Sequence, residues 1–184
     1  MSETTPAPGA TPQMPPIIVN VQYVKDLSLE VPGAPEIFNQ LRAAPKVDIN
    51  LDVQVRRLVE GQNVFEVELM IRADASEATE AGAPGGDGAA PPAGSAAGRV
   101  FVAELTYCGV FTLSGLPENA IEPVLLVECP RILFPFARNL LADITREGGF
   151  PPVLLQPIDF AALWQQRRAQ AASSNVINPP SSLV

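Results

Sequence analysis

Four stretches of the chain alternate apolar and polar residues with a period of two, and this pattern restricts the possible folds. A β-strand places successive side chains on opposite faces, so the alternation predicts strands with one buried face and one face in water. Strands of that kind belong in antiparallel sheets. The turn-rich segment 57–63 predicts a hairpin between the second and third strands. The expected strands are residues 17–30, 47–55, 64–74 and 99–113.

The two faces of the expected sheet differ in chemistry. In the first strand, strict alternation places apolar residues inward: Ile17, Val19, Val21, Tyr23, Leu27 and Leu29. The outward positions of the four strands gather acidic residues, which Arg56 and Arg72 only partly balance: Asp26, Glu30, Asp48, Asp52, Glu66, Glu68 and Glu104. This acidic face is either a solvated surface or a docking site for a basic partner.

Two helical segments are expected after the strands. The first begins near Phe134, where Pro135 suits a first helical turn, and it ends at Gly148 and Gly149. The second follows Asp159, which is a good N-cap residue. The proline-rich segment 150–157 between them is expected to be extended. The sequence thus predicts an α+β fold in which two C-terminal helices pack on one face of a four-stranded antiparallel sheet.

Composition predicts one domain with two tails and one insert. Residues 1–16 contain five prolines, residues 171–184 are rich in Ser, Asn and Pro, and twenty of the twenty-four residues 75–98 are Ala, Gly, Pro or Ser. Such segments bury too little apolar surface to offset their ordering entropy. We therefore expect disordered tails at 1–16 and 171–184, and a single domain at 17–170 with a low-complexity loop at 75–98.

The residue types argue against catalysis. The chain has no histidine, which excludes Ser-His-Asp and Cys-His arrangements and histidine metal centres. The two cysteines, Cys108 and Cys129, form no C-x-x-C pattern and are expected to be free buried thiols of a reducing compartment. No P-loop pattern occurs. We expect a protein that is not an enzyme and has no cofactor or metal.

Charge and hydropathy limit the classes of partner that the protein can bind. The net charge of −8 argues against binding to nucleic acid, and residues 1–128, with seventeen acidic and seven basic residues, hold all of the acidic excess. No basic residue precedes Lys25, and no apolar run is long enough to cross a bilayer. We expect a soluble, cytoplasmic protein without direct membrane insertion.

Several motifs resemble the SecB family, the export chaperones of Gram-negative bacteria. The clearest are P-R-I-L-F-P-F-A-R at 130–138, G-G-F-P-P at 148–152 and P-I-D-F-A-A-L-W at 157–164. Segments 23–35 and 101–111 agree as well and occur in the family's order. The resemblance implies an ATP-independent chaperone that binds unfolded secretory precursors in the cytosol and delivers them to the translocase ATPase SecA.

The resemblance also implies site residues. Those matching the contact motif for the basic, zinc-binding tail of SecA are Asp26, Glu30, Val102 and Glu104. The expected groove for unfolded clients lies between the irregular crossover 31–45 and the second helix, with candidate lining residues Ile37, Phe38, Leu41, Phe150, Phe160 and Trp164. SecB forms homotetramers, as dimers of dimers, and the positions expected to influence assembly are Ala103, Leu105 and Tyr107.

Two alternatives stay open at the level of sequence. Each candidate groove aromatic can equally be ordinary core, because an isolated aromatic in an apolar stretch is usually packing. The whole protein can also be a carrier of a small hydrophobic ligand, since a curved sheet over helices can enclose an apolar cavity. The carrier hypothesis predicts a monomer that ignores unfolded chains, and it leaves the acidic face unexplained.

Overall fold

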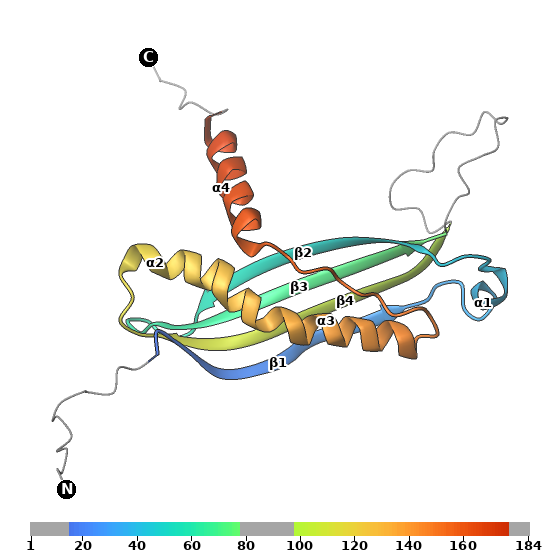
Figure 1. The fold of residues 1–184 in the computed structure, drawn as a ribbon, viewed down its shortest axis with the longest axis horizontal. Coiled ribbons are helices and arrows are strands. Elements are labelled where there is room, and N and C mark those ends of the chain that lie inside the picture. Colours follow the sequence, from blue (N-terminus) through green and yellow to red (C-terminus); the bar gives the residue numbers. More distant parts are fainter. Residues whose placement is uncertain (1–14, 78–97, 177–184) are drawn as a thin grey trace, which may run out of the picture.

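The computed structural model describes the backbone of residues 15–77 and 98–176 and contains one antiparallel sheet with helices on one side (Figure 1). The strand order is β1-β4-β3-β2, and neighbouring strands are antiparallel. The long link between β3 and β4 does not prevent their pairing, because loop length adds little closure entropy. The strands are β1 (Ile17–Glu30), β2 (Lys46–Arg57), β3 (Val64–Ser76) and β4 (Arg99–Leu113).

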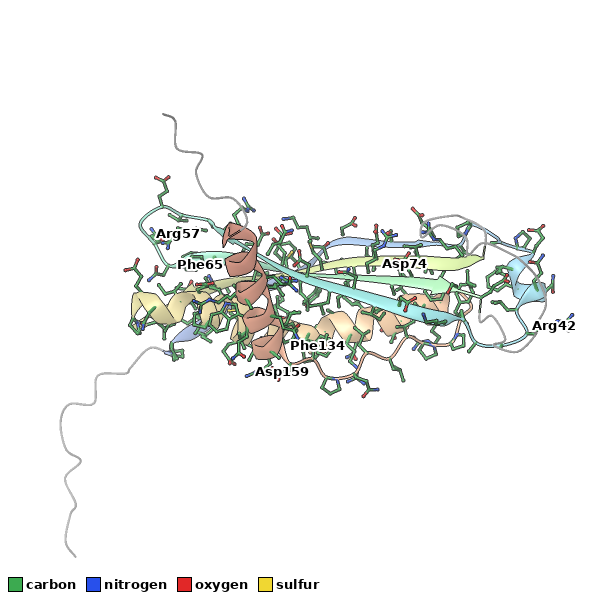
Figure 2. All side chains as sticks on the ribbon, turned by 90° about the horizontal axis from the view of Figure 1, so that it is seen from above. Arg42, Arg57, Phe65, Asp74, Phe134 and Asp159 are labelled. Atoms are coloured by element: carbon green, nitrogen blue, oxygen red, sulfur yellow. The ribbon has the colours of Figure 1, made fainter. Side chains whose placement is uncertain are left out.

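The inner face of the sheet carries the core. Phe65, Val67, Leu69 and Ile71 of β3 alternate with outward residues and are buried, as are the inward residues of β4. The covering layer is a long helical segment that crosses the sheet on this side, and Figure 2, turned by 90° from Figure 1, shows the two layers next to each other. The predicted fold class is therefore confirmed.

The covering helix is longer than the sequence suggested. It runs from Glu118 to Glu147 as α2 (Glu118–Pro123), a π-helical segment η1 (Val124–Glu128) and α3 (Cys129–Glu147). The prediction of a start near Phe134 was wrong, and Pro135 lies inside α3. A proline removes one backbone hydrogen bond and crowds the preceding turn, yet Pro123 and Pro130 both lie within the continuous segment. The wider π turns between them, together with burial of Leu125 and Val127, keep the helix continuous.

The end of α3 and the start of the last helix match the prediction. Gly149, the second residue after α3, adopts a φ of 87°, a backbone conformation that favours glycine. Helix α4 (Phe160–Val176) follows the extended segment 151–158, and the Ala162 N–H donates to Asp159 Oδ1 at 3.0 Å. Helix α4 does not lie flat on the sheet: it packs against η1 and beside the edge strand β2 (Figures 1 and 2).

Strand β1 departs from strict alternation at two β-bulges. The register shifts between Val19 and Val21 and again between Val24 and Asp26. Each extra residue inverts the side-chain phase, so Val21 and Tyr23 lie opposite the outward residues Val110 and Cys108, contrary to the prediction. The second inversion cancels the first, and residues 26–30 return to the expected phase.

The described strands and helices extend past the expected domain limits. Strand β3 continues through Ala75 and Ser76, and α4 continues to Val176, so neither the insert nor the C-terminal tail begins where composition suggested. At the other end, Pro15 and Pro16 accept hydrogen bonds from Ser114. Residues 1–14, 78–97 and 177–184, which make up most of the expected tails and insert, lie outside the described residues. The crossover after β1 contains a single helical turn, α1 (Ile37–Gln40).

Candidate functional site

The four residues expected to contact SecA lie together on the outer face of β1 and β4. Glu30 is directly opposite Val102, and Ser28, between Asp26 and Glu30 on this face, is opposite Glu104. Asp26 and Glu30 are exposed, whereas Val102 is almost completely buried beneath its neighbours. The cluster therefore exposes the carboxylates of Asp26 and Glu30, whereas Val102 lies below the surface. A shallow depression of about 440 Å³ lies beside it, lined in part by Asp26, Glu104 and Thr106.

The acidic residues of the outer face differ in how far they are neutralised. Arg72 pairs with Asp74 at 2.7 Å and also with Glu104, while Arg167 of α4 pairs with Asp52 at 2.5 Å. Among the described residues, no cation lies within ion-pair distance of Asp26 or Glu30. These two carboxylates are consequently the ones free to attract a basic partner.

Glu66, also predicted as part of the acidic face, is instead a buried structural group. Its side chain is clamped between the Tyr23 hydroxyl, Arg56 Nη2 at 2.7 Å and Lys25 Nζ at 3.5 Å, and the residue is 2 % exposed. The hydrogen bond from Tyr23 is the largest cause that lowers the pKa of Glu66 from 4.5 to about 2, with the arginine and lysine adding to it. Burial opposes the shift but is outweighed. The Glu66 carboxylate is therefore charged but not accessible at the surface.

The candidate client residues fall into separate groups. Around α1, the Phe38 and Phe150 rings stack at 5.3 Å, and Phe150 meets Phe101 at 4.8 Å. Ile37 and Phe150 are buried and belong to the core, whereas Phe38 is 46 % exposed. Of this group, only Phe38 offers an apolar surface to another molecule.

Next to this group is an apolar hollow of about 440 Å³ that the sequence analysis did not assign. The end of the crossover and the start of β2 form one wall, with Pro45, Val47 and Ile49, and the extended segment 151–156 forms the other. Leu154 projects at its rim and is 61 % exposed. Alternation predicted the inward phase of Val47 and Ile49, but only the structure shows that no helix covers them fully.

A second apolar hollow contains Trp164. It measures about 220 Å³ and lies between α4, the α2–η1 segment and Val53 of β2. The indole N–H of Trp164 donates to Glu122 Oε1 at 3.3 Å, and the Arg168 guanidinium lies 5.0 Å from the ring centroid. Both hollows thus lie along β2, whereas the predicted groove joined the crossover directly to α4.

The other two candidate groove residues are less accessible. Phe160 is fully buried and packs edge-on against Phe134 at 5.9 Å, so its role is in the core. Leu41 is partly buried at the end of α1 and packs against the core. The alternative reading of ordinary packing therefore fits Ile37, Phe150 and Phe160.

The three positions expected to influence assembly face inward beneath α3. Ala103 and Leu105 are buried, and Tyr107 is nearly so. The Tyr107 ring stacks on Phe136 of α3 at 6.2 Å, and Phe136 is itself 49 % exposed. Within one chain, these three residues can reach a neighbouring molecule only through the side chains that cover them.

Two further properties of the described residues concern metals and membranes. Residues 15–77 and 98–176 contain no cluster of three or more side chains of the kinds that coordinate a metal ion. None of the helices in these same ranges combines the length and apolar character needed to cross a bilayer.

The sequence relationships are close. Residues 10–171 match the family described as preprotein translocase subunit SecB. The protein-export protein SecB of Granulibacter bethesdensis is 60 % identical over 179 residues, covering 97 % of this chain and 96 % of the relative. The protein of the same name from Acidiphilium cryptum is 58 % identical over 166 residues, covering 90 % and 97 %.

A solved structure has a similar fold. The SecB-like chaperone of Mycobacterium tuberculosis, solved with a peptide from an antitoxin, superposes with a TM-score of 0.56 over 77 % of this chain and 90 % of that one. Its sequence is only 14 % identical, so this likeness concerns the fold. The family match and the close relatives, on a sheet with an acidic outer face and apolar hollows at its edge, show that this chain belongs to the SecB family of protein-export chaperones.

Proposed function

We propose that this protein is an ATP-independent holding chaperone that binds unfolded secretory precursors in the cytoplasm and delivers them to SecA. The observation that carries the proposal is the pair of apolar hollows along β2, next to Ile49 and to Val53. Two shallow apolar sites along one strand suit an extended chain with apolar residues at intervals better than they suit a compact ligand. Apolar contacts also tolerate many different sequences.

Docking of SecA is proposed at the outer face, separate from the client hollows. Asp26 and Glu30 carry uncompensated negative charge there, with Val102 and Glu104 beside them. Carboxylates at a wet surface attract a basic segment over several ångströms and favour rapid association. The zinc ion of such a partner would be held by the partner's own residues.

Self-association into a dimer of dimers is proposed through β1 and α3. Strand β1 is one of the two edge strands of the sheet, and four of its apolar residues are exposed at about two fifths or more. Phe136 of α3 lies over Tyr107, which is the inward neighbour of Val24 on β1. An apolar surface and an open strand edge on one side rarely persist in a monomer. The exposed apolar residues of β1 are Val19, Val24 and Leu27, which have the inward phase, and Val21, which faces outward.

Release of the client in this proposal needs no catalysis by the chain itself. Arg167 links the two surfaces, because its guanidinium pairs with Asp52 of the outer face while α4 lines the Trp164 hollow. Docking of a basic segment on the outer face competes for such carboxylates. Competition of this kind would loosen α4 and weaken client contacts without hydrolysis of a nucleotide.

The test is binding of one secretory precursor, compared in its unfolded and folded forms without nucleotide. We expect tight binding to the unfolded form alone, by a species whose mass from light scattering corresponds to four chains. Leu154→Asp, at the rim of the first hollow, is expected to weaken binding about tenfold, because it places a charge where apolar surface is buried. Leu58→Asp is the matched control, since Leu58 is exposed in the hairpin and lines neither hollow.

The outer face is tested separately by reversing charges. Asp26→Lys with Glu104→Lys is expected to abolish binding to SecA and to leave client binding unchanged. Loss of both activities would contradict the separation of the two surfaces. A monomer that is indifferent to unfolded chains would contradict the chaperone proposal and favour the carrier of a small hydrophobic ligand.

A further inference from the structure

The outward direction of Asp26 and Glu30 depends on a single extra residue in β1. Val24 is paired with the inward residue Tyr107, and Asp26 is paired with the outward residue Thr106, which leaves Lys25 without a position of its own in the ladder. Tyr23 already faces outward, so unbroken alternation from Tyr23 would turn Asp26 and Glu30 toward the helix layer. The bulge at Lys25 is what returns them to the outer face.

The side chain of Lys25, the bulged residue, is held by two carboxylates. Lys25 Nζ donates to Glu68 Oε1 at 2.7 Å and lies 3.5 Å from Glu66 Oε2. Both carboxylates belong to β3, so the side chain spans β4 to reach them. On the inner face, Leu29 keeps the residues after the bulge in their orientation, because its side chain packs closely on Gly148. A Cβ atom at position 148 would lie 2.3 Å from Leu29 Cδ2. The bulge is thus held from both faces of the sheet.

We propose that Lys25, through its ion pair with Glu68, is a positioning residue that fixes the bulge and thereby sets Asp26 and Glu30 for a basic partner segment. The inference rests on the proposed docking of SecA at the outer face. It assigns a favourable role to a lysine inside an acidic site, where its own charge repels a basic partner. If only charge matters, removal of the Lys25 charge strengthens binding of a basic segment. If Lys25 positions the bulge, the same removal weakens that binding.

The test compares Lys25→Met with Lys46→Met. Lys46 lies on the same outer face of β2, in regular register opposite Ser76, and pairs with Asp48 at 3.2 Å. Both variants make the net charge of −8 one unit more negative. The probe is a zinc-loaded synthetic peptide with the sequence of the C-terminal tail of SecA, and its affinity is measured by calorimetry at one ionic strength.

We expect Lys25→Met to bind the peptide about fivefold more weakly, a change in the range that partly exposed ion pairs produce. Lys46→Met is expected to bind as well as the wild type or more tightly. Lys25→Arg keeps the charge and the reach to Glu68, and is expected to restore wild-type affinity. Amide hydrogen exchange in residues 23–27 is expected to quicken in Lys25→Met, while affinity for an unfolded client stays unchanged.

The outcomes separate this inference from the proposed function. Unchanged or tighter binding of the peptide by Lys25→Met overturns the positioning role, even though SecA docking itself stands. A wild-type protein that does not bind the peptide contradicts the docking proposal and the inference with it. Weaker binding of both peptide and client would show general destabilisation, which also overturns the specific role.

Discussion

Tyr23 donates its hydroxyl hydrogen to Glu66 across the whole width of strand β4. Tyr23 reaches this position only because the first bulge in β1 turns it outward, opposite Cys108. The bond joins the edge strand β1 to β3, and Arg56 continues the link to β2. One buried carboxylate thus connects three strands of the sheet on the face that has no helix layer.

This arrangement predicts acid sensitivity through Glu66. The folded pKa of Glu66 is lowered to about 2 from 4.5, so its contribution is fully present above about pH 5 and is lost as the pH falls toward 2. Glu66→Gln is expected to reduce the free energy of unfolding by about 2 kcal/mol at pH 7. Urea denaturation at one protein concentration, repeated between pH 7 and pH 3, measures both the loss and its pH dependence.

The control for Glu66 is Glu104→Gln on the same face. Glu104 is half exposed and pairs with Arg72, so its replacement is expected to change the free energy of unfolding much less. The difference in stability between wild type and Glu66→Gln should shrink steadily below pH 5. A constant difference over this range would contradict the account of Glu66 as a charged, buried link.

The hydrogen bonds of Thr145 hold the extended segment that forms one wall of the first hollow. Its buried hydroxyl donates to Leu141 O at 2.8 Å and accepts from the Val153 N–H at 3.0 Å, which fastens the extended segment 151–156 to α3. Thr145→Val leaves that N–H unpaired and is expected to cost about 2 kcal/mol of unfolding free energy.

The same change is expected to weaken binding of an unfolded client, because the wall that carries Leu154 loses its anchor. Thr106→Val is the matched control, an equal change in volume on the outer face of β4. Denaturation and client binding are measured on both variants. Equal behaviour of the two would show that the Thr145 hydroxyl does not hold the wall.

The reactivity of the two cysteines tests the register of β1 without any binding partner. Both are buried, and burial is the main cause that raises the pKa of Cys108 to about 11 and that of Cys129 to about 12. We expect neither thiol to react with a disulfide reagent at pH 8 until the protein unfolds. Tyr23→Ala should expose Cys108 alone, since Tyr23 is its neighbour on the outer face. Reaction of Cys129 first would contradict the register of β1.

The sequence predicted the fold class because three of the strands alternate without interruption. In β2, β3 and β4 the inward positions between the strand ends are apolar, and the structure pairs these strands in a single register except at the end of β3. Strand β1 also alternates in sequence, but apolar Val21 and Val24 fit either face. A bulge leaves no clear mark in such a pattern, so the outward turn of Tyr23 could not be predicted.

The helical layer and the client hollows were harder to predict for different reasons. The continuous helix could not be predicted because it contains three prolines, and proline is usual at helix limits. The π turns that accommodate a proline have no simple sequence signal. The first hollow joins residues near 45 to residues near 154, which no local pattern relates. The predicted groove consisted mainly of aromatic residues, whereas the first hollow is lined largely by aliphatic residues and prolines.

Arg167 holds α4 beside the edge of β2. Its guanidinium donates to Leu51 O at 3.2 Å and to Val53 O at 3.5 Å, and pairs with Asp52. These carbonyls lie on the open edge of the sheet, where an added strand would otherwise bind. Arg167→Ala is expected to free that edge and to loosen α4.

Trp164 provides the measurement, because it is the only tryptophan of the chain and lies on α4 in the same hollow. We expect its fluorescence in Arg167→Ala to shift to the red and to become more accessible to iodide, with faster amide exchange over residues 160–170. Arg168→Ala is the control, because Arg168 lies over the indole ring but the contacts to the β2 carbonyls belong to Arg167. If amide exchange in α4 quickens equally in both variants, the helix is held by its apolar packing on η1 and not by the strand edge.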